Sequence, residues 1–384
     1  SPVRRGSRPV RAPVLTGRGR HRGHKAARAM KTSRCSPVLR VPHICLAMMG
    51  VLGLTAVDST APRQLHPEPR NAVRVILSAF DRVPVVALGG ALHGEQNLDD
   101  FALQVVRDPH FADTVNNVVI ECGNSLYQGV LDRYVAGADV PMSRVQLVWR
   151  NTTQAFGCIG TEQKTFIDAV RNLNRHRGPA RRIRVLAGDP PIDWPKVRTA
   201  ADINAFLLRR DSNFAAVVGD QVLARHQKAL LLIGDLHILR RRSIFGAPTS
   251  RTITMRLESK YPRSTYVITH GGFGDQHGEI ERRLVKWPVP SIATLRGTWL
   301  GLLDPSFVYT GVFLVSNPSK EVNPFPGLKL QDLADAYLYL GPASAIREVQ
   351  RPQETDPTYA REIDRRRRLM GMGGGPKHIG PKKT

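Results

Sequence analysis

Residues 84–90 have the sequence PVVALGG, a short apolar run that ends in two glycines. Such a run, bounded by residues that favour turns, is typical of a strand buried on both faces of a sheet. Residues 95–107 then carry apolar side chains at helical spacing, and residues 117–123 (NVVIECG) form a second apolar run of strand length. A second amphipathic helix pattern follows at 125–136. This alternation with short connections predicts an α/β fold with a mostly parallel central sheet flanked by helices.

The rest of the pattern extends the sheet and places a helical insertion in the middle of the chain. Helical spacing covers residues 161–173 and the longer stretch 201–228, which we expect to break near Gly219. Further strands are predicted at residues 182–187, 229–233, 265–269 and 335–340. We therefore expect one α/β domain over residues 62–350.

Residues 30–61 have the layout of a secretory signal peptide. The basic residues Lys31, Arg34 and Arg40 precede an apolar stretch at 44–57, and small residues follow it. The apolar stretch is short for a membrane span, so we expect no transmembrane span in the mature chain. This layout predicts an exported protein, periplasmic or secreted; the alternative is a fortuitous apolar patch.

The positive charge of the chain is concentrated at its two ends. The chain has 56 Lys and Arg against 32 Asp and Glu, a net charge of +24. Residues 1–61 hold 12 basic and one acidic residue and residues 361–384 hold 8 basic and two acidic ones, which leaves 36 basic and 29 acidic residues, a net +7, for 62–360. We predict a disordered basic extension at 1–29 and a disordered basic tail at 351–384. The body shows no motif that reads nucleic acid, so we expect no specific nucleic-acid partner.

Two cysteines lie in the predicted domain. Export would place Cys122 and Cys158 in an oxidising compartment, where they can pair. Their spacing resembles no zinc motif. The sequence leaves open whether they meet.

Polar side chains follow several predicted strands at the point where each strand ends. Loops from the carboxyl ends of parallel strands converge, so these side chains are the candidates for a site. An ionised carboxylate at the end of a buried strand needs a partner or a function. The candidates are His93 and Glu95 after the first strand, Glu121 after the second, Asp235 and His237 after 229–233, and His270 after 265–269.

Histidines beside carboxylates support more than one kind of chemistry. A histidine held by a carboxylate can take a proton from water or from another nucleophile. The trio His93, Glu121 and His237 can alternatively bind a divalent metal or a haem iron. The third alternative is a scaffold in which the histidines only hold loops together. The HExxH and CxxC spacings are absent, which disfavours zinc, and the absence of GxSxG and GxGxxG disfavours a serine α/β-hydrolase and a dinucleotide enzyme.

Four short stretches over residues 75–345 carry a family resemblance. Residues 89–94 (GGALHG) are similar to a Gly-Glu-x-x-His-Gly motif, with Gly90 in place of its glutamate. Glu121 matches a second-strand glutamate, residues 210–215 (RDSNFA) resemble an Arg-Asp-x-x-Met-Ala motif, and residues 233–237 (IGDLH) match a strand with a terminal histidine. In these motifs and their order the sequence resembles the erythromycin-esterase-like group, which is related to the ChaN-like haem-uptake and Tiki-like families.

The resemblance implies roles for these residues in the hydrolysis of an ester or amide bond. It makes His93 a general base on water and Glu121 its orienting carboxylate. It makes Arg210 and His237 contacts to the oxyanion or to the substrate. The expected further substrate contacts are Glu95, Asp211, Asp235 and His270.

The sequence departs from the family's motif at Gly90, where the family usually has a glutamate. The first hypothesis is therefore a hydrolase of a small molecule, with or without a metal. The second is a non-catalytic protein that binds haem or iron through His93 or His237. The sequence does not fix the substrate, the metal or haem content, or the oligomeric state.

Overall fold

The strands of the described residues form one sheet in the order β1-β7-β8-β6-β2-β5-β3-β4. The run from β8 to β4 is parallel throughout, whereas β7 pairs antiparallel with β8, and β1 pairs antiparallel with β7. The predicted α/β fold with a mostly parallel sheet is confirmed. The strands are β1 (Arg70–Asn71), β2 (Val85–Gly90), β3 (Asn117–Asn124), β4 (Arg184–Asp189), β5 (Ala229–Gly234), β6 (Thr265–Thr269), β7 (Ser291–Thr294) and β8 (Ala336–Tyr339).

The computed structural model describes nine parts of the chain, all of them within the unit Thr60–Thr384. They are residues 65–90, 94–154, 158, 161–241, 243, 250–271, 278–309, 323–349 and 356–372. The predicted basic extension and signal peptide, and also His93, lie outside the described residues.

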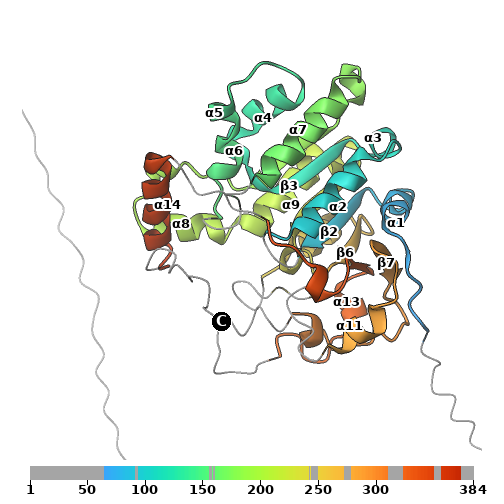
Figure 1. Ribbon diagram of the computed structural model, residues 1–384. Helices are drawn as coiled ribbons and strands as arrows, with labels where there is room; N and C mark the ends of the chain where they lie inside the picture. The colour runs from blue at the N-terminus through green and yellow to red at the C-terminus, as the bar shows by residue number, and fades with distance from the viewer. Residues whose placement is uncertain are drawn as a thin grey trace, which may run out of the picture. The chain divides into compact units, whose positions relative to one another are not determined.

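Helices lie on both faces of the sheet. Figure 1 shows α2 and α7 side by side over β2 and β3. Helix α9, which follows β4, packs on the opposite face beside α10. None of the helices in the described ranges is long and apolar enough to cross a membrane. The helices are α1 (Ala72–Ala79), α2 (Gln96–Arg107), α3 (Phe111–Thr114), α4 (Gln128–Val135), α5 (Met142–Val145), α6 (Leu147–Arg150), α7 (Glu162–Asn174), α8 (Ala200–Leu207), α9 (Arg210–Gln221), α10 (Ile253–Lys260), α11 (Glu279–Leu284), α13 (Leu330–Leu333) and α14 (Pro357–Leu369).

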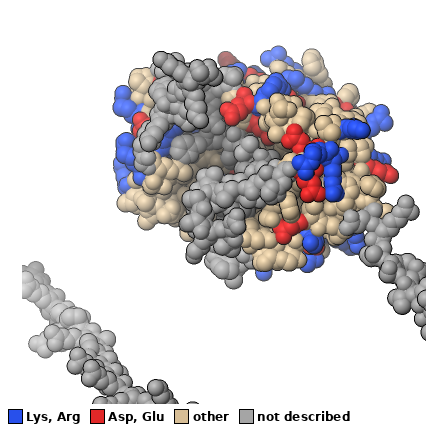
Figure 2. Space-filling view, turned by 60° about the horizontal axis from the view of Figure 1, so that its bottom comes forward, with Lys and Arg blue, Asp and Glu red and all other residues tan. Residues whose placement is uncertain are grey.

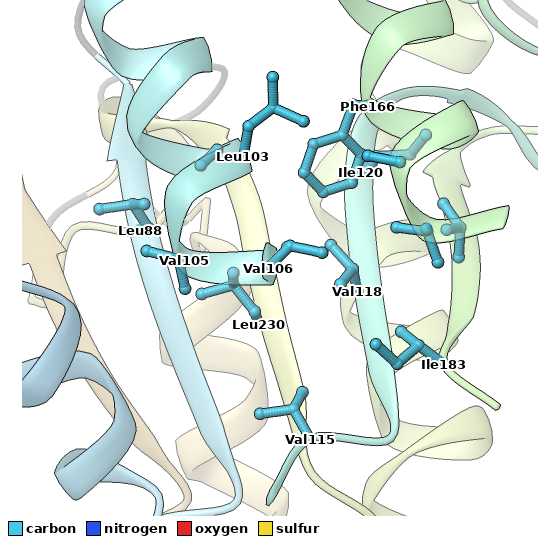
Figure 3. Close-up of a cluster of buried hydrophobic side chains, with 14 of the residues drawn as sticks. Leu88, Leu103, Val105, Val106, Val115, Val118, Ile120, Phe166, Ile183 and Leu230 are labelled. Atoms are coloured by element: carbon cyan, nitrogen blue, oxygen red, sulfur yellow. The ribbon is translucent and has the colours of Figure 1, made fainter. Parts of the chain in front are cut away.

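The central strands alternate between two hydrophobic cores, one on each face of the sheet. Val86 and Leu88 of β2 point into the core that α1, α2 and α4–α7 cover, with Phe101, Leu131 and Ile167. Val85 and Ala87 point into the opposite core, with side chains of α9, α10 and α11. Figure 3 shows the first core, where Val106 lies near the strand residues Val118 and Leu230, and Leu103 lies near Phe166. Burial on both faces explains why these strands are continuous apolar runs.

The middle of the chain is helical, as predicted, but its break lies elsewhere. The stretch 201–228 contains α8, α9 and a 3₁₀ turn at Leu223–Arg225. The break falls at Leu208 and Arg209, where the cap of one helix meets the start of the next, and Gly219 lies inside α9. A Cβ at Gly219 would meet only a ring carbon of Tyr261 at 3.6 Å, so this glycine permits helix there instead of ending it.

The carboxyl-terminal region contains a helix that we predicted to be disordered. Asp356 caps α14, with its carboxylate accepting from the backbone N–H groups of Thr358 and Tyr359. The helix ends beside α8, where Leu369 packs in a small hydrophobic cluster with Ile203. This corrects our prediction for Pro357–Leu369: the arginine-rich segment folds because it packs against Trp194 and Ile203 and because the donors of its buried Arg366 all form hydrogen bonds.

Charges of both signs lie side by side on the face of the molecule shown in Figure 2. One such contact joins Arg347 to Asp100 at 2.7 Å, with both side chains largely exposed. An exposed pair of this kind contributes little to stability.

Candidate active site

Buried charged side chains gather at the carboxyl ends of the parallel strands. Glu121 lies in the last half of β3, Asp189 is the final residue of β4, and Arg210 begins α9. His237 closes a 3₁₀ turn, η5 (Asp235–His237), directly after β5. Because neighbouring parallel strands end at the same edge of the sheet, these four side chains meet although their positions in the sequence span more than a hundred residues.

The guanidinium of Arg210 joins the other three side chains. Its Nη2 donates to Oε1 of Glu121 at 2.8 Å, its Nε donates to Oδ1 of Asp189 at 3.1 Å, and its Nη1 lies 3.2 Å from Nε2 of His237. Burial lowers the pKa of Arg210, but the charges of Glu121 and Asp189 raise it more, so its pKa lies above the ordinary value. Arg210 therefore stays a cation between two buried carboxylates.

A loop before α7 and a backbone amide complete the partners of the two carboxylates. Thr153 donates its hydroxyl to Oδ1 of Asp189 at 2.6 Å and its backbone N–H to Oδ2 at 2.5 Å. Burial nevertheless raises the pKa of Asp189, against the opposing effects of Arg210 and Thr153. Glu121 accepts from the amide of Gln154 and, at 2.9 Å, from the backbone N–H of Gly234.

His237 has a different partner on each ring nitrogen. Its Nδ1 lies 2.5 Å from Oδ1 of Asp211, the residue after Arg210 in α9. A carboxylate accepts and a guanidinium only donates, so both contacts are satisfied by the neutral ring with its proton on Nδ1. A histidine whose Nδ1–H is held by a carboxylate presents a basic Nε2, which is the arrangement of a general base with its orienting group.

A second group of buried charges lies at the ends of β6, β2 and β5. Nε2 of His270 is 2.7 Å from Oε1 of Glu95, and its Nδ1 donates to the carbonyl oxygen of Leu338 at 3.1 Å. Burial lowers the pKa of His270, but the hydrogen bond and charge of Glu95 raise it more, so its pKa lies above the ordinary value. Glu95 and His270 therefore form a buried ion pair.

Asp235 belongs to the second group and is completely buried. Its Oδ2 accepts from the backbone N–H of Gly271 at 3.1 Å, and its Oδ1 has no hydrogen-bond partner among the described residues. Burial raises the pKa of Asp235 to about 6, against the charge of His270 and the hydrogen bond from Gly271. Its carboxylate lies directly over Gly89 of β2, where a Cβ would come within 1.7 Å of Oδ1.

A cavity of about 220 Å³ opens at this edge of the sheet, between α2 and α7. Glu95 and Glu121 line it from the two groups of buried charges, and Asp99 and Glu162 line it from the two helices. Burial raises the pKa of Asp99 to about 7, with smaller contributions from nearby carboxylates, Glu162 first among them. The cavity therefore combines acidic groups with the apolar side chains of the helices, and it has room for part of a small molecule.

The structure brings most of the predicted site residues into these two groups. Glu121, Arg210, Asp211 and His237 lie together in the first. Glu95, Asp235 and His270 form the second. His93 lies outside the described residues, although Gly90 and Gly94 on either side of it both line the cavity.

Asp189, Thr153 and Gln154 are members of the site that the sequence analysis missed. Asp189 follows the apolar run 182–187 after one glycine, the same signal that selected the other strand-end residues, and could have been found by it. Thr153 and Gln154 lie in an irregular loop, and no local pattern marks them. Cys122, next to Glu121, forms a disulfide with Cys158, which answers the question the sequence left open.

The described residues do not fit a metal ion or a haem iron. Among them, no group of three or more His, Cys, Asp or Glu side chains is arranged to hold a metal. A cation between Glu121 and His237 would face the guanidinium of Arg210, which contacts both. Both ring nitrogens of His270 have partners, and an iron at Nε2 of His237 would lie beside the guanidinium of Arg210, whose positive charge would repel it.

Comparisons with known proteins give likeness in structure only. No protein-family model matches the chain, and no curated protein gives a significant match. Solved structures similar to this chain include a Bacillus cereus protein, at 11% identity and a TM-score of 0.48 over 75% of this chain and 97% of that one. A succinoglycan biosynthesis protein is similar at 10% identity and a TM-score of 0.47, over 75% and 97% of the two chains.

The chain is also similar to an erythromycin esterase. The structure is that of a mutant in its open conformation, at 11% identity and a TM-score of 0.43, over 72% of this chain and 94% of the esterase. The esterase bears the name of the group that the four sequence motifs resemble. At such identities the likeness concerns the fold, and the chemistry has to be argued from the site.

Proposed function

We propose that this protein is a hydrolase of ester or amide bonds in a small molecule, in which a strand-end histidine activates water. The observation that supports this most directly is His237, whose Nδ1 is bound to Asp211 and whose Nε2 faces Arg210. A base, its orienting carboxylate and a neighbouring cation are the parts that acyl transfer to water requires.

In the proposed reaction, Nε2 of His237 takes a proton from water as the water oxygen bonds to the carbonyl carbon. Asp211 stabilises the imidazolium that forms. The guanidinium of Arg210 stabilises the negative charge that develops on the carbonyl oxygen. The bond to the leaving group then breaks, and the leaving oxygen or nitrogen takes the proton from His237, which releases an acid and an alcohol or amine.

Nε2 of His237 can be freed for this role at small cost. Its contact with Arg210 is the longest of the three that the guanidinium makes, at 3.2 Å, and the only one to a neutral group. The contacts with Glu121 and Asp189 are charge-assisted and hold Arg210 in place without it. Hydrogen bonds of catalytic groups commonly change between the free and the substrate-bound enzyme.

The cavity beside Glu121 supplies the place for the substrate in this proposal. Its apolar walls suit the body of a small molecule, and Gly234, which donates to Glu121, also lines it. His93 is the second candidate base, because the resemblance gives it that role.

The test is a panel of chromogenic esters and anilides, with p-nitrophenyl acetate first, assayed with the purified full chain. His237→Ala should lower kcat/KM at least a hundredfold, because general base catalysis contributes about that much. His93→Ala measures the role of the other histidine. His110→Ala is the matched control, because His110 is exposed at the start of α3, and should leave the rate unchanged.

A panel without turnover, with the protein folded by circular dichroism, would overturn the proposal. A full loss of activity in His93→Ala with wild-type activity in His237→Ala would move the role of base to His93 and reject the role of His237.

We also propose that the protein is exported. The basic and apolar pattern of residues 30–61 motivates this, and the Cys122–Cys158 disulfide supports it, because disulfides persist in oxidising compartments. Fusing residues 30–70 to a reporter that is active only outside the cytoplasm tests export; a reporter that stays inactive argues against it.

A further inference from the structure

Helix α14 carries one buried arginine, Arg366, which is 3% exposed. Its guanidinium lies over the ring of Trp194 at 4.4 Å and donates from Nε to Glu362 at 2.8 Å. Burial lowers the pKa of Arg366, with Glu362 opposing this effect. Burying a guanidinium costs free energy unless its N–H groups donate hydrogen bonds. The remaining hydrogen bonds of Arg366 therefore identify the part of the protein that its burial serves to hold.

The remaining donors of Arg366 bind the loop that leads into the site. Nη1 donates to the carbonyl oxygen of Arg150 at 2.6 Å, and Nη2 donates to Oδ1 of Asn151 at 2.7 Å. The hydroxyl of Tyr359, also on α14, donates to the same carbonyl of Arg150 at 2.9 Å. The indole of Trp194 donates to the carbonyl of the next residue in the loop, Thr152, at 3.1 Å.

The other side of this loop binds the carboxylates of the site. Thr153 donates to Asp189, and Gln154 donates to Glu121. These two carboxylates are the ones that hold Arg210. Residues 150–154 therefore lie between α14 on one side and the Arg210 network on the other, and we call them the bridging loop.

We propose that α14 acts as a clasp that positions the site: Arg366 fixes the bridging loop, and the loop fixes Glu121 and Asp189 around Arg210. Arg366 is a positioning residue, because it touches the loop and not the reacting groups. The part of this proposal that concerns catalysis rests on the proposed hydrolase function. The part that concerns the loop does not.

The geometry explains why the clasp acts on catalysis more than on substrate binding. Asp189 and Glu121 orient Arg210, whose task in the proposed reaction is to stabilise charge in the transition state. The bridging loop is not among the segments that line the cavity. A small displacement of the loop therefore lowers kcat by a larger factor than it changes KM, to which it contributes only through Glu121 in the cavity wall.

The first test is Arg366→Ala in the full chain, with two readouts. Hydrogen exchange of residues 150–154, Thr153 above all, should become about tenfold faster, because its amide donates to Asp189 only while the loop is fixed. With p-nitrophenyl acetate, kcat should fall about tenfold or more with a smaller change in KM, since misplacement by about 1 Å costs up to a hundredfold. Arg361→Ala is the control on the same helix, because Arg361 is exposed and bonds only locally, to Thr358; it should change neither readout.

Tyr359→Phe is the second variant, for the case that Arg366→Ala does not fold. It removes one donor to Arg150 and keeps the ring, so it should change both readouts in the same direction by a smaller factor. A folded variant with unchanged exchange of the bridging loop would overturn the clasp. Faster exchange with unchanged kcat would overturn the link to catalysis. If wild type hydrolyses nothing, the proposed function fails, and the exchange experiment still decides the clasp.

Discussion

The two groups of buried charges at the edge of the sheet balance their charges by different means. In the first, one guanidinium serves Glu121 and Asp189, with a neutral histidine beside it. In the second, the imidazole of His270 is the cation nearest to Glu95 and Asp235, and one oxygen of Asp235 has no hydrogen-bond partner among the described residues. Each group has more carboxylates than cations, but the guanidinium of the first hydrogen-bonds both Glu121 and Asp189, whereas the imidazole of the second hydrogen-bonds Glu95 and the carbonyl oxygen of Leu338.

This difference separates a fixed charge from titratable ones. Arg210 stays charged at every pH at which the protein is folded. His270 and Asp235 both have pKa values raised by the fold, the first through Glu95 against burial and the second through burial. The cation of the first group is therefore a fixed charge, whereas the cation of the second titrates. Asp189 in the first group and Asp99 beside the cavity also have raised pKa values and add to the pH sensitivity of stability.

Removing the guanidinium of Arg210 should have the largest effect on stability and on activity. Arg210→Ala leaves Glu121 and Asp189 buried without their cation, and breaking a buried pair in this way costs about 3–5 kcal/mol. We expect the free energy of unfolding in urea to fall by that amount. Activity should be lost as well. Arg209→Ala, at the exposed neighbouring position, should change stability by less than about 0.5 kcal/mol. A similarly small change in the free energy of unfolding of both variants would show that Arg210 does not hold the two buried carboxylates.

The second group should be disturbed most by a side chain at Gly89. In Gly89→Ala the new Cβ would lie 1.7 Å from Oδ1 of Asp235, and we expect a loss of about 3 kcal/mol in thermal or urea unfolding. Gly129→Ala is the control, because a Cβ at this position in α4 meets nothing within 4 Å; it should stabilise by about 0.5 kcal/mol. Asp235→Ala combined with Gly89→Ala should recover part of the loss. Equal losses in the single and double variants would contradict the contact.

The pH dependence of stability should distinguish Asp235 from the rest of the protein. Its pKa rises from 3.8 to about 6 on folding, so the folded state binds the proton more tightly. The contribution of Asp235 to stability is therefore complete below about pH 4 and is lost as the pH rises through about 6. Asp235→Asn should remove this loss, on the order of 2 kcal/mol, from the difference between urea unfolding at pH 4 and pH 7. Parallel pH profiles for wild type and variant would refute the assignment.

His270 should act in a higher pH window than Asp235. Because its folded pKa is raised above the ordinary value of 6.5, its contribution is complete below pH 6.5 and is lost as the pH rises through the folded value. His270→Gln should therefore lower the free energy of unfolding most below pH 6.5, and its difference from wild type should shrink as the pH rises through the folded pKa.

The smallest effect on stability is expected at Thr153, which bonds Asp189 from the bridging loop. Thr153→Val removes the hydroxyl that donates to buried Asp189 at 2.6 Å and should cost about 1 kcal/mol in urea unfolding. Thr153→Ser keeps the donor and should restore most of the stability. If serine is no better than valine, the methyl group of Thr153 matters and its hydrogen bond does not.

The strands were predictable because their signal is local. The apolar runs at 84–90, 117–123, 182–187, 229–233, 265–269 and 335–340 correspond to β2, β3, β4, β5, β6 and β8. The two strands that were not predicted, β1 and β7, are short and lie at the antiparallel edge of the sheet, where few residues carry the pattern. Helix α14 was missed because its run of arginines is typical of a disordered tail, and only Trp194 and the bridging loop make burial of Arg366 favourable.

The sequence by itself determined which side chains would reach the carboxyl edge of the sheet. A strand ends where its apolar run ends, and the polar residue after it must follow the strand to that edge. Glu95, Glu121, Asp235, His237 and His270 were found in this way.

Only the tertiary structure decided which of these charges meet. Glu121 and His237 share Arg210, which comes from a helix, whereas Glu95 pairs with His270 across 175 residues of sequence. The order β6-β2-β5-β3-β4 sets these neighbours, and it follows from how the helices pack on the two faces. The pairing of buried charges depends on distances within a few ångströms, and no local pattern in the chain carries that information.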